Sequence, residues 1–352
     1  MRANRLGLVC LLLSFVLLVG CASTGTQAQT SETEESPVET SSDAPVYVDE
    51  VALDEVALED EAVALSAAPA AALPDTIATQ ATTAAANVIV AEASGKLVKT
   101  SSKATIDYSN TSDGYVMVKY TASTTKRLKA QVQGPTATYT YNINPGEWTV
   151  FPLSDGNGSY QFKVFENVSD TKYSMVASVS QNVTLNDEFA PFIRPNQYVD
   201  YTAASKTVAK AQELTQNLTD PLVKVEAVYN YVVNNMTYDK QKAATVTSGY
   251  LPVLDTVLEA KKGICFDYAS LMTGMLRSQG IPCKLVIGYA GTAYHAWINV
   301  WSAETGWIDG AIYFNGAAWQ RMDPTFASTG KQSEKIMAYI GDGKNYTAKY
   351  LY

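Results

Sequence analysis

The stretch GICFDYA at residues 263–269 decides the interpretation of this chain, because it joins a glycine break, a cysteine and a helix start. Helical periodicity runs from Cys265 to about Ser278, and a Gly-Ile-Pro sequence then ends it. Free N–H groups and the helix dipole stabilise anions in a first helical turn, so a thiol there ionises more readily. The thiolate is the reactive form. The alternative is a buried structural cysteine, which is common for this residue type.

The chain has a single histidine, His295, in a β-like run from residue 294 to 301. On a strand His295, Trp297 and Asn299 share one face, so the imidazole can face the helix start. A cysteine nucleophile needs such a partner, and the partner needs an orienting group. Asp323, which closes a later β-like run, is the candidate, and Asp309 is the fallback. A lone histidine is otherwise most often structural.

The elements around these residues predict helices followed by an antiparallel sheet. Asp220 and then Pro221 are a good helix start, for a helix that runs to about Asn235. A shorter helix is expected at 252–262, before Gly263. β-like runs follow at 284–289, 294–301, 306–312 and 319–322, which together give an α+β layout.

The stretch from about 205 to 326 resembles the transglutaminase-like superfamily, which shares its nucleophile logic with papain-type peptidases. The matching pieces are GICFDYA, then LRSQGIP at 276–282, HAW at 295–297 and DPT at 323–325. The resemblance implies a papain-like fold with Cys265 as nucleophile, His295 as base and acid, and Asp323 as orienting carboxylate. The gap of 28 residues between His295 and Asp323 is longer than in minimal members.

Acyl attack creates an oxyanion that needs hydrogen-bond donors. The backbone N–H of Cys265 is one candidate. Tyr238 is the tentative second, since it stands where transglutaminases carry a tryptophan; a core tyrosine at a helix end is the alternative. Asp267 suits the helix dipole better than a catalytic role. Trp297 is expected beside the site.

Cys283 is typical of a small core residue. Its alternative role is a disulfide with Cys265, which would switch the site off. One histidine and two separated cysteines do not make a zinc site, and no glycine-rich phosphate loop is present. We therefore expect no metal and no cofactor.

The N-terminus predicts a lipoprotein signal peptide at residues 1–20. Arg2 and Arg5 precede an apolar run from 6 to 19, and Leu-Val-Gly then leads to Cys21. This ending resembles the lipobox, in which the cysteine is acylated by chains such as palmitate. An acylated Cys21 implies an extracytoplasmic protein anchored to the cell membrane.

Residues 21–95 predict a disordered tether. Fourteen acidic and no basic residues lie between Cys21 and Ser94, with few aromatics. The net charge of −9 therefore belongs to the tether. The sequence contains no basic cluster, so its charge does not indicate a nucleic-acid partner.

Residues 96–190 alternate over short stretches such as 115–120 and 160–165, with turn signals between them. This pattern predicts an all-β, immunoglobulin-like sandwich. Its expected role is spacing, substrate presentation or adhesion. Residues 200–330 would form the transglutaminase-like domain. Residues 331–352 would be a C-terminal extension that packs on the domain or covers the cleft.

These features predict a cell-surface, cysteine-dependent acyl-transfer enzyme acting on peptide or glutamine-type amide bonds of a protein or peptide partner at the cell surface or cell wall. Hydrolysis by a protease or amidase is slightly favoured over transamidation, because water is always present. The alternative is a non-catalytic adhesion or scaffold protein that uses the domain as a binding module.

Overall fold

A computed structural model describes residues 47–49, 88–303, 306–309, 312–314, 319–321, 324–325 and 345–352. The predicted signal run, Cys21 and most of the predicted tether lie outside these ranges. Within the ranges, no helix combines the length and the apolar character that crossing a membrane requires.

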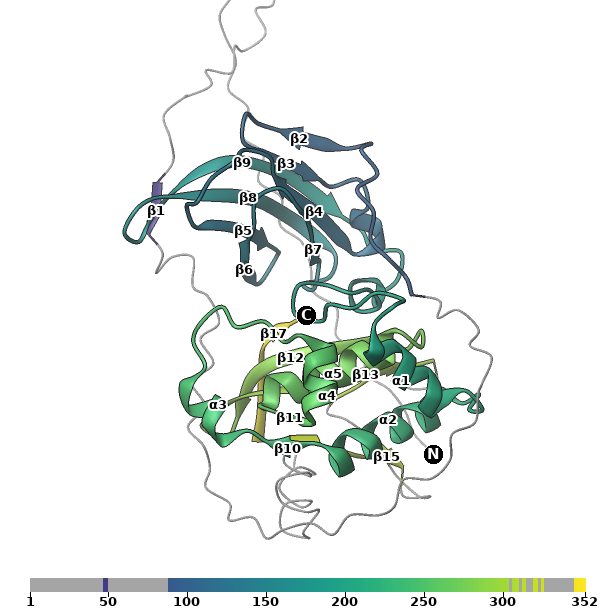
Figure 1. The fold of residues 1–352 in the computed structure, drawn as a ribbon. Coiled ribbons are helices and arrows are strands. Elements are labelled where there is room, and N and C mark those ends of the chain that lie inside the picture. Colours follow the sequence, from purple (N-terminus) through teal and green to yellow (C-terminus); the bar gives the residue numbers. More distant parts are fainter. Residues whose placement is uncertain are drawn as a thin grey trace, which may run out of the picture. The chain divides into compact units, whose positions relative to one another are not determined.

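The strands before residue 184 form two antiparallel sheets (Figure 1). One has the order β2-β3-β4-β7 and the other β1-β9-β8-β5-β6. Their bounds are β1 Tyr47–Asp49, β2 Val98–Thr100, β3 Ala104–Asp107, β4 Tyr115–Tyr120, β5 Leu128–Gln133, β6 Thr138–Ile143, β7 Trp148–Pro152, β8 Gly158–Ser169 and β9 Lys172–Val183.

Alternation of side chains explains why these residues form strands. Along β8, Tyr160 and Phe162 are buried while Gln161 between them is exposed, as expected of a strand with one face on a core. The two sheets meet across that core, where the rings of Tyr141 and Phe151 lie 4.4 Å apart. Residues 98–183 are therefore a sandwich of two sheets.

The α-helices of the second half of the chain include α1 Lys206–Thr215, α2 Pro221–Asn235, α3 Lys240–Thr245, α4 Leu254–Ala260 and α5 Cys265–Arg277. The predicted start of α2 is confirmed, since the Asp220 side chain accepts a hydrogen bond from the backbone N–H of Leu222 at 2.7 Å. Every residue of α5 is buried, so this helix is the centre of the C-terminal core.

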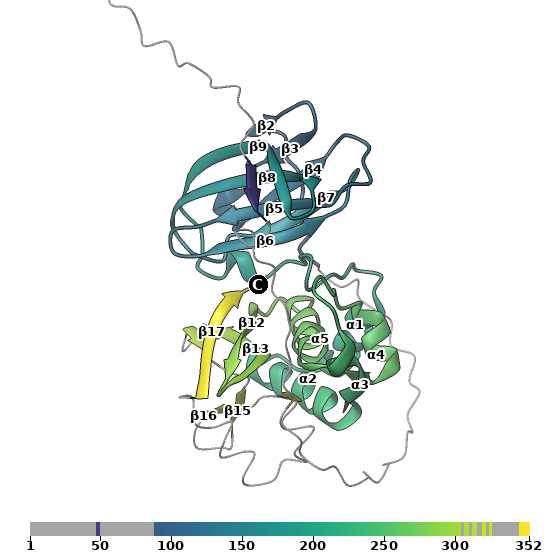
Figure 2. The ribbon, with the colours of Figure 1, turned by 90° about the vertical axis from the view of Figure 1, so that its left-hand side faces the viewer.

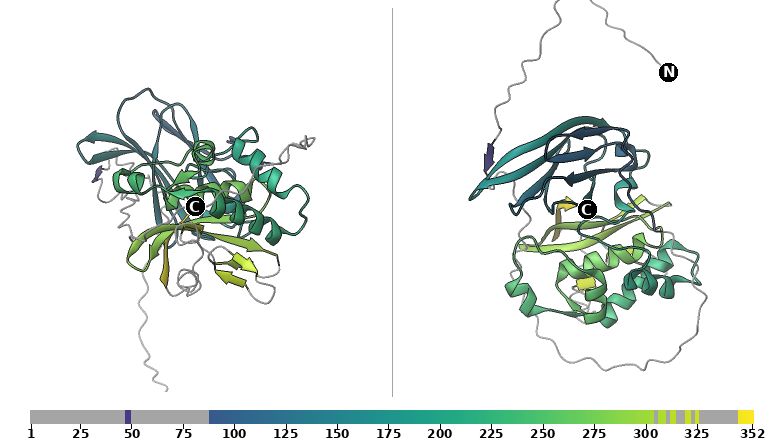
Figure 3. Two further views of the ribbon diagram at one scale, coloured as in Figure 1. Left: turned by 60° about the horizontal axis from the view of Figure 1, so that its bottom comes forward. Right: turned by 45° about the horizontal axis from the view of Figure 1, so that its top comes forward.

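A four-stranded antiparallel sheet with the order β14-β13-β12-β17 packs against α5. Figures 2 and 3 show the helices gathered on one side of this sheet, with β17 at its edge. The bounds are β12 Cys283–Ala290, β13 Ala293–Ser302, β14 Gly306–Ile308 and β17 Tyr346–Leu351. The predicted α+β layout is thus confirmed. The two-residue strands β10 Thr237–Tyr238 and β11 Lys262–Gly263 pair in parallel, and β15 Ile312–Phe314 and β16 Trp319–Arg321 form a hairpin. Short 3-10 helices are also described at Thr111–Asp113 and Ala190–Phe192.

The last residues of the chain form a strand of the sheet. β17 pairs antiparallel with β12, and Tyr352 exchanges backbone hydrogen bonds of 2.8 Å with Leu285. The Tyr352 ring also packs on Tyr139 and Tyr141 of the sandwich. This part of the extension therefore packs on the domain, while residues 331–344 lie outside the described ranges.

Candidate active site

Cys265 is the first residue of α5, directly after the extended Ile264. The predicted helix start at the cysteine is therefore correct. The Cys265 side chain is buried and forms no disulfide. The first-turn N–H groups and the helix dipole act on a thiol held out of bulk water, which strengthens their effect on a thiolate.

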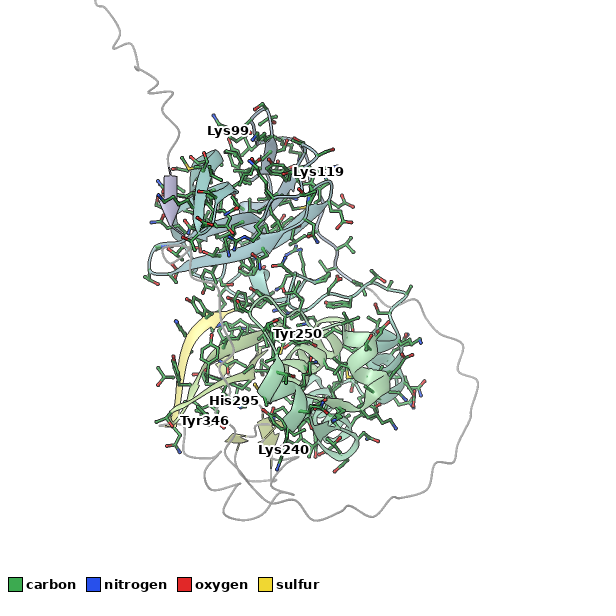
Figure 4. The ribbon with its side chains drawn as sticks, turned by 60° about the vertical axis from the view of Figure 1, so that its left-hand side comes forward. Lys99, Lys119, Lys240, Tyr250, His295 and Tyr346 are labelled. Atoms are coloured by element: carbon green, nitrogen blue, oxygen red, sulfur yellow. The ribbon has the colours of Figure 1, made fainter. Side chains whose placement is uncertain are left out.

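His295 lies on β13, opposite Gly288 of β12. The imidazole is buried and stacks on Trp297, with ring centroids 6.2 Å apart and an interplanar angle of 19°. The predicted shared face of His295 and Trp297 is therefore confirmed. Tyr346 of β17 joins them, at 6.4 Å from His295 and 5.2 Å from Trp297, and Figure 4 shows His295 and Tyr346 side by side.

Gly288 makes room for this ring cluster. A Cβ at position 288 would lie 2.1 Å from the carbonyl oxygen of Thr347 and 2.9 Å from the Trp297 ring. The contact of Tyr346 with His295 was not predicted from the sequence, since only the pairing of β17 with β12 brings the two residues together.

The elements that carry Cys265 and His295 are in direct contact, because α5 packs on β13. Tyr294, next to His295, lies in the core that α5 shares with the sheet. Burial raises the pKa of Tyr294, and neighbouring tyrosines and the Cys265 thiol raise it further. The thiol–imidazole pairing itself stays a prediction.

Of the two candidate orienting carboxylates, Asp323 and Asp309, the described residues include only Asp309. Asp323 lies outside the described residues, although Thr325 two positions later is buried. Asp309 accepts a hydrogen bond from Asn299 at 2.7 Å. Asn299 is four residues along β13 from His295, which is about 13 Å on a strand. Asp309 is therefore bound to Asn299, and its fallback role as the orienting carboxylate stays a prediction.

Tyr238 is tied to the segment that leads into α5. It forms β10 with Thr237, and β10 pairs in parallel with β11, so that Tyr238 lies opposite Gly263. The backbone N–H of Asp239 donates to the carbonyl of Gly263 at 2.8 Å. Tyr238 is therefore held opposite Gly263, which precedes Cys265 by two residues. Its role in stabilising the oxyanion stays a prediction.

Asp267 is fully buried in the first turn of α5 and accepts three hydrogen bonds. They come from the backbone N–H of Ile264 at 2.8 Å, the ammonium of Lys242 at 2.6 Å and the hydroxyl of Tyr250 at 2.6 Å. Burial raises the pKa of Tyr250, and the Asp267 carboxylate raises it further. The predicted first-turn position is correct, but the partners on α3 and its following segment were not predicted.

Cys283 is buried like Cys265, but it lies at the start of a strand instead of a helix. It lies at the start of β12, fully buried, with Sγ 3.6 Å from Thr273 Oγ1. Burial raises the pKa of its thiol to about 12. Neither cysteine is in a disulfide in the described structure, so no bridge joins Cys265 and Cys283 here. Among the described residues, no group of three His, Cys, Asp or Glu side chains could hold a metal ion.

Comparisons with known proteins match the region that contains Cys265 and His295 to a known family. Residues 208–324 match the family model described as the transglutaminase-like superfamily. The chain is 30% identical over 153 residues to a protein-glutamine gamma-glutamyltransferase of Pseudomonas aeruginosa, which covers 39% of this chain and 21% of that protein. It is 24% identical over 204 residues to the uncharacterized protein YebA of Bacillus subtilis, and the match covers 51% of this chain and 27% of YebA. The chain thus spans about a quarter of the length of these relatives.

Among solved structures, a putative cysteine protease from Cytophaga hutchinsonii is similar with a TM-score of 0.32 and 16% identity, covering 65% of this chain and 78% of that one. The periplasmic domain of TgpA from Pseudomonas aeruginosa has a TM-score of 0.30 and 16% identity, covering 69% and 100%. The family match itself spans α2 to α5, with Cys265 at the start of α5, and strand β13, which carries His295. This chain therefore carries a domain of the transglutaminase-like superfamily at residues 208–324.

Proposed function

We propose that this chain is a cysteine-dependent acyl-transfer enzyme. The Cys265 thiolate attacks a carboxamide or peptide carbonyl, and the oxyanion collapses to a thioester as the amine or ammonia leaves with a proton from His295. Water then hydrolyses the thioester to an acid, or an amine takes the acyl group and forms a new amide. The thiol is regenerated in both cases.

The observation that carries the proposal is the position of Cys265. It is the first residue of a fully buried helix that packs on the strand bearing the only histidine of the chain. Helix N-termini lower thiol pKa values, and a histidine on the contacting strand can supply the base. Asp323 is proposed to orient that histidine, and Tyr238 to donate to the oxyanion.

Hydrolysis is proposed as the main reaction, because water needs no binding site. A curated relative named as a protein-glutamine gamma-glutamyltransferase makes transfer to an amine the competing outcome. Mass spectrometry separates the two. A glutamine-containing peptide offered with a primary amine gains about 1 Da on hydrolysis and the mass of the amine less ammonia on transamidation.

The two buried cysteines supply a matched test. Wild type, Cys265→Ala and Cys283→Ala are incubated with a small thiol-directed probe and with a peptide library. We expect labelling at residue 265 and turnover in wild type and Cys283→Ala, and loss of turnover by more than about 10³-fold in Cys265→Ala. Labelling at residue 265 no faster than in the denatured chain, with no turnover, would instead support the scaffold alternative.

We also propose that the enzyme works outside the cytoplasm on a lipid anchor at Cys21, with residues 22–95 as tether. The support is the signal-like run before Cys21 and the acidic composition after it. Growth with an alkyne-labelled fatty acid tests this. Label should appear in wild type and vanish in Cys21→Ser, whereas equal label in both would contradict the anchor.

The sandwich is proposed to be immunoglobulin-like. The order β3-β4-β7 in one sheet and β9-β8-β5-β6 in the other follows the A-B-E and G-F-C-C′ order of that fold, which supports the proposal.

A further inference from the structure

We infer that Lys242 and Asp267 form a positioning pair that holds the segment bearing Tyr238 against the start of the nucleophile helix and keeps the charge beside Cys265 balanced. This inference rests on the proposed function of Cys265. Neither residue is placed against substrate.

The first step is the geometry of the pair. The Lys242 ammonium lies 2.6 Å from Asp267 Oδ2, and it is 2.5 Å from the hydroxyl of Tyr250, which in turn donates to Asp267 Oδ1. The Asp267 side chain is fully buried, while that of Lys242 keeps 27% of its exposure. The pair therefore links α3, the segment after it and the first turn of α5.

The second step is what the pair holds in place. Lys242 belongs to the same short stretch as Tyr238 and Asp239, and its backbone N–H donates to the Asp239 carboxylate at 3.0 Å. That N–H lowers the pKa of Asp239, and an ion pair with Lys262 lowers it further. Residues 238–242 are thus fixed at one end to β11, the strand that precedes Cys265, and at the other end to Asp267.

Gly263 shows how closely the parts fit. A Cβ at position 263 would lie 2.5 Å from the Asp267 Cβ and 2.8 Å from its Oδ2. The Asp267 side chain therefore fills the space that any other residue at 263 would need, and it does so opposite Tyr238.

The third step is charge. Asp267 is two residues from Cys265 in the same helical turn, so a lone buried carboxylate there would oppose ionisation of the thiol. The Lys242 ammonium offsets that charge. Other charged or titratable groups on the segments next to the start of α5 include Tyr238, Asp239, Lys240, Tyr250, Lys262, Tyr294 and His295. Of these, Tyr250 donates a hydrogen bond to Asp267.

The test measures the alkylation rate of Cys265 by iodoacetamide against pH, quantified by mass spectrometry on the peptide that contains residue 265. The full chain is used as wild type, Lys242→Met, Asp267→Asn, the double variant and Lys242→Arg. Lys206→Met, which breaks an exposed ion pair with Glu259 on α1 and α4, is the control.

We expect the midpoint of the pH profile to rise by about one pH unit in Lys242→Met and to fall by about one in Asp267→Asn. The double variant should return close to wild type, and Lys242→Arg and Lys206→Met should stay there. Opposite shifts that cancel are not produced by general loss of structure. Midpoints that stay within about 0.2 units of wild type, or shifts of the same sign in both single variants, overturn the inference.

Three further outcomes are separable. If Lys242→Met does not fold, the isosteric Asp267→Asn decides alone, since an unchanged or raised midpoint there contradicts the pair. If Cys265 of wild type reacts no faster than in the denatured chain, the proposed function fails. If it reacts fast and the variants match it, only the positioning pair fails.

Discussion

The Glu166 site of the sandwich and the Asp267 site at the start of α5 are built from the same parts, a buried carboxylate with lysine and tyrosine partners. Glu166 on β8 pairs with Lys103 and Lys126, each at 2.9 Å, and accepts a hydrogen bond from Tyr120. Burial raises the pKa of Glu166, but these three partners outweigh it and lower the pKa to about 2.

The two sites differ in what lies beside the carboxylate. Asp267 has a single lysine partner and also caps the backbone N–H of Ile264, the residue before Cys265. The two lysines of Glu166 are about half exposed, and the neighbouring strands carry no cysteine or histidine. What distinguishes the Asp267 site is therefore not the buried ion pair itself but its attachment to the first turn of the helix that begins at Cys265.

The largest effect should come from filling the space beside Asp267. Gly263→Ala places a Cβ 2.5 Å from the Asp267 side chain, and Gly134→Ala places one 2.5 Å from Asp155 in the sandwich. Both clashes should destabilise by about 1–3 kcal/mol. Only Gly263→Ala should also slow Cys265 alkylation, by about 10²-fold, because it displaces the helix start. Equal alkylation rates in the two folded variants would remove the distinction between the sites.

The second prediction compares the lysines. Lys242→Met leaves a fully buried carboxylate without a cation and should lower the free energy of unfolding by about 3 kcal/mol. Lys103→Met leaves Glu166 with Lys126 and should lower it by less than about 1 kcal/mol. Urea unfolding followed by tryptophan fluorescence measures both. A larger loss in Lys103→Met would mean that the sandwich pair is the more important one.

How much of this the sequence could predict depends on the range of the interaction. The start of α2 follows from Asp220 and Pro221, and the start of α5 from Gly263 and Cys265, because capping and glycine breaks act within one turn. α3 was missed, since six residues carry too little periodicity to predict a helix.

The Lys242–Asp267 pair and the Tyr346–His295 contact were not predictable in the same way. Their partners are 25 and 51 positions apart in the chain and meet only because α3 reaches α5 and β17 pairs with β12. No local pattern encodes such a register. The partner of Asp309 was not predictable for the same reason, because only the pairing of β13 with β14 brings Asp309 to Asn299.

The third prediction uses the low pKa of Glu166. Its value of about 2 in the folded protein lies below the ordinary value of 4.5, so the site stabilises the fold above pH 4.5. That contribution is lost as the pH falls from 4.5 towards 2, and it amounts to about 2 kcal/mol. Glu166→Gln should flatten the stability profile over this window without changing Cys265 alkylation at pH 7. An unchanged profile would contradict the cluster.

The smallest effect is expected at an exposed pair. Lys206 and Glu259 form an ion pair whose side chains keep 67% and 56% of their exposure. Solvent screens such pairs, so Lys206→Met should leave the unfolding midpoint and the alkylation rate unchanged. A measurable loss in either would show that surface charge contributes where burial is absent, and would weaken the ranking of the four sites.

The central claim is that Cys265 is a nucleophile activated by His295. The most direct measurement is the alkylation rate at residue 265 from pH 4 to pH 10 in wild type and His295→Gln. An activated thiol predicts a wild-type midpoint about two units below the usual cysteine value of about 8.5, and a rise of at least about one unit in His295→Gln. A wild-type midpoint at the usual value, unchanged by His295→Gln, would contradict the claim.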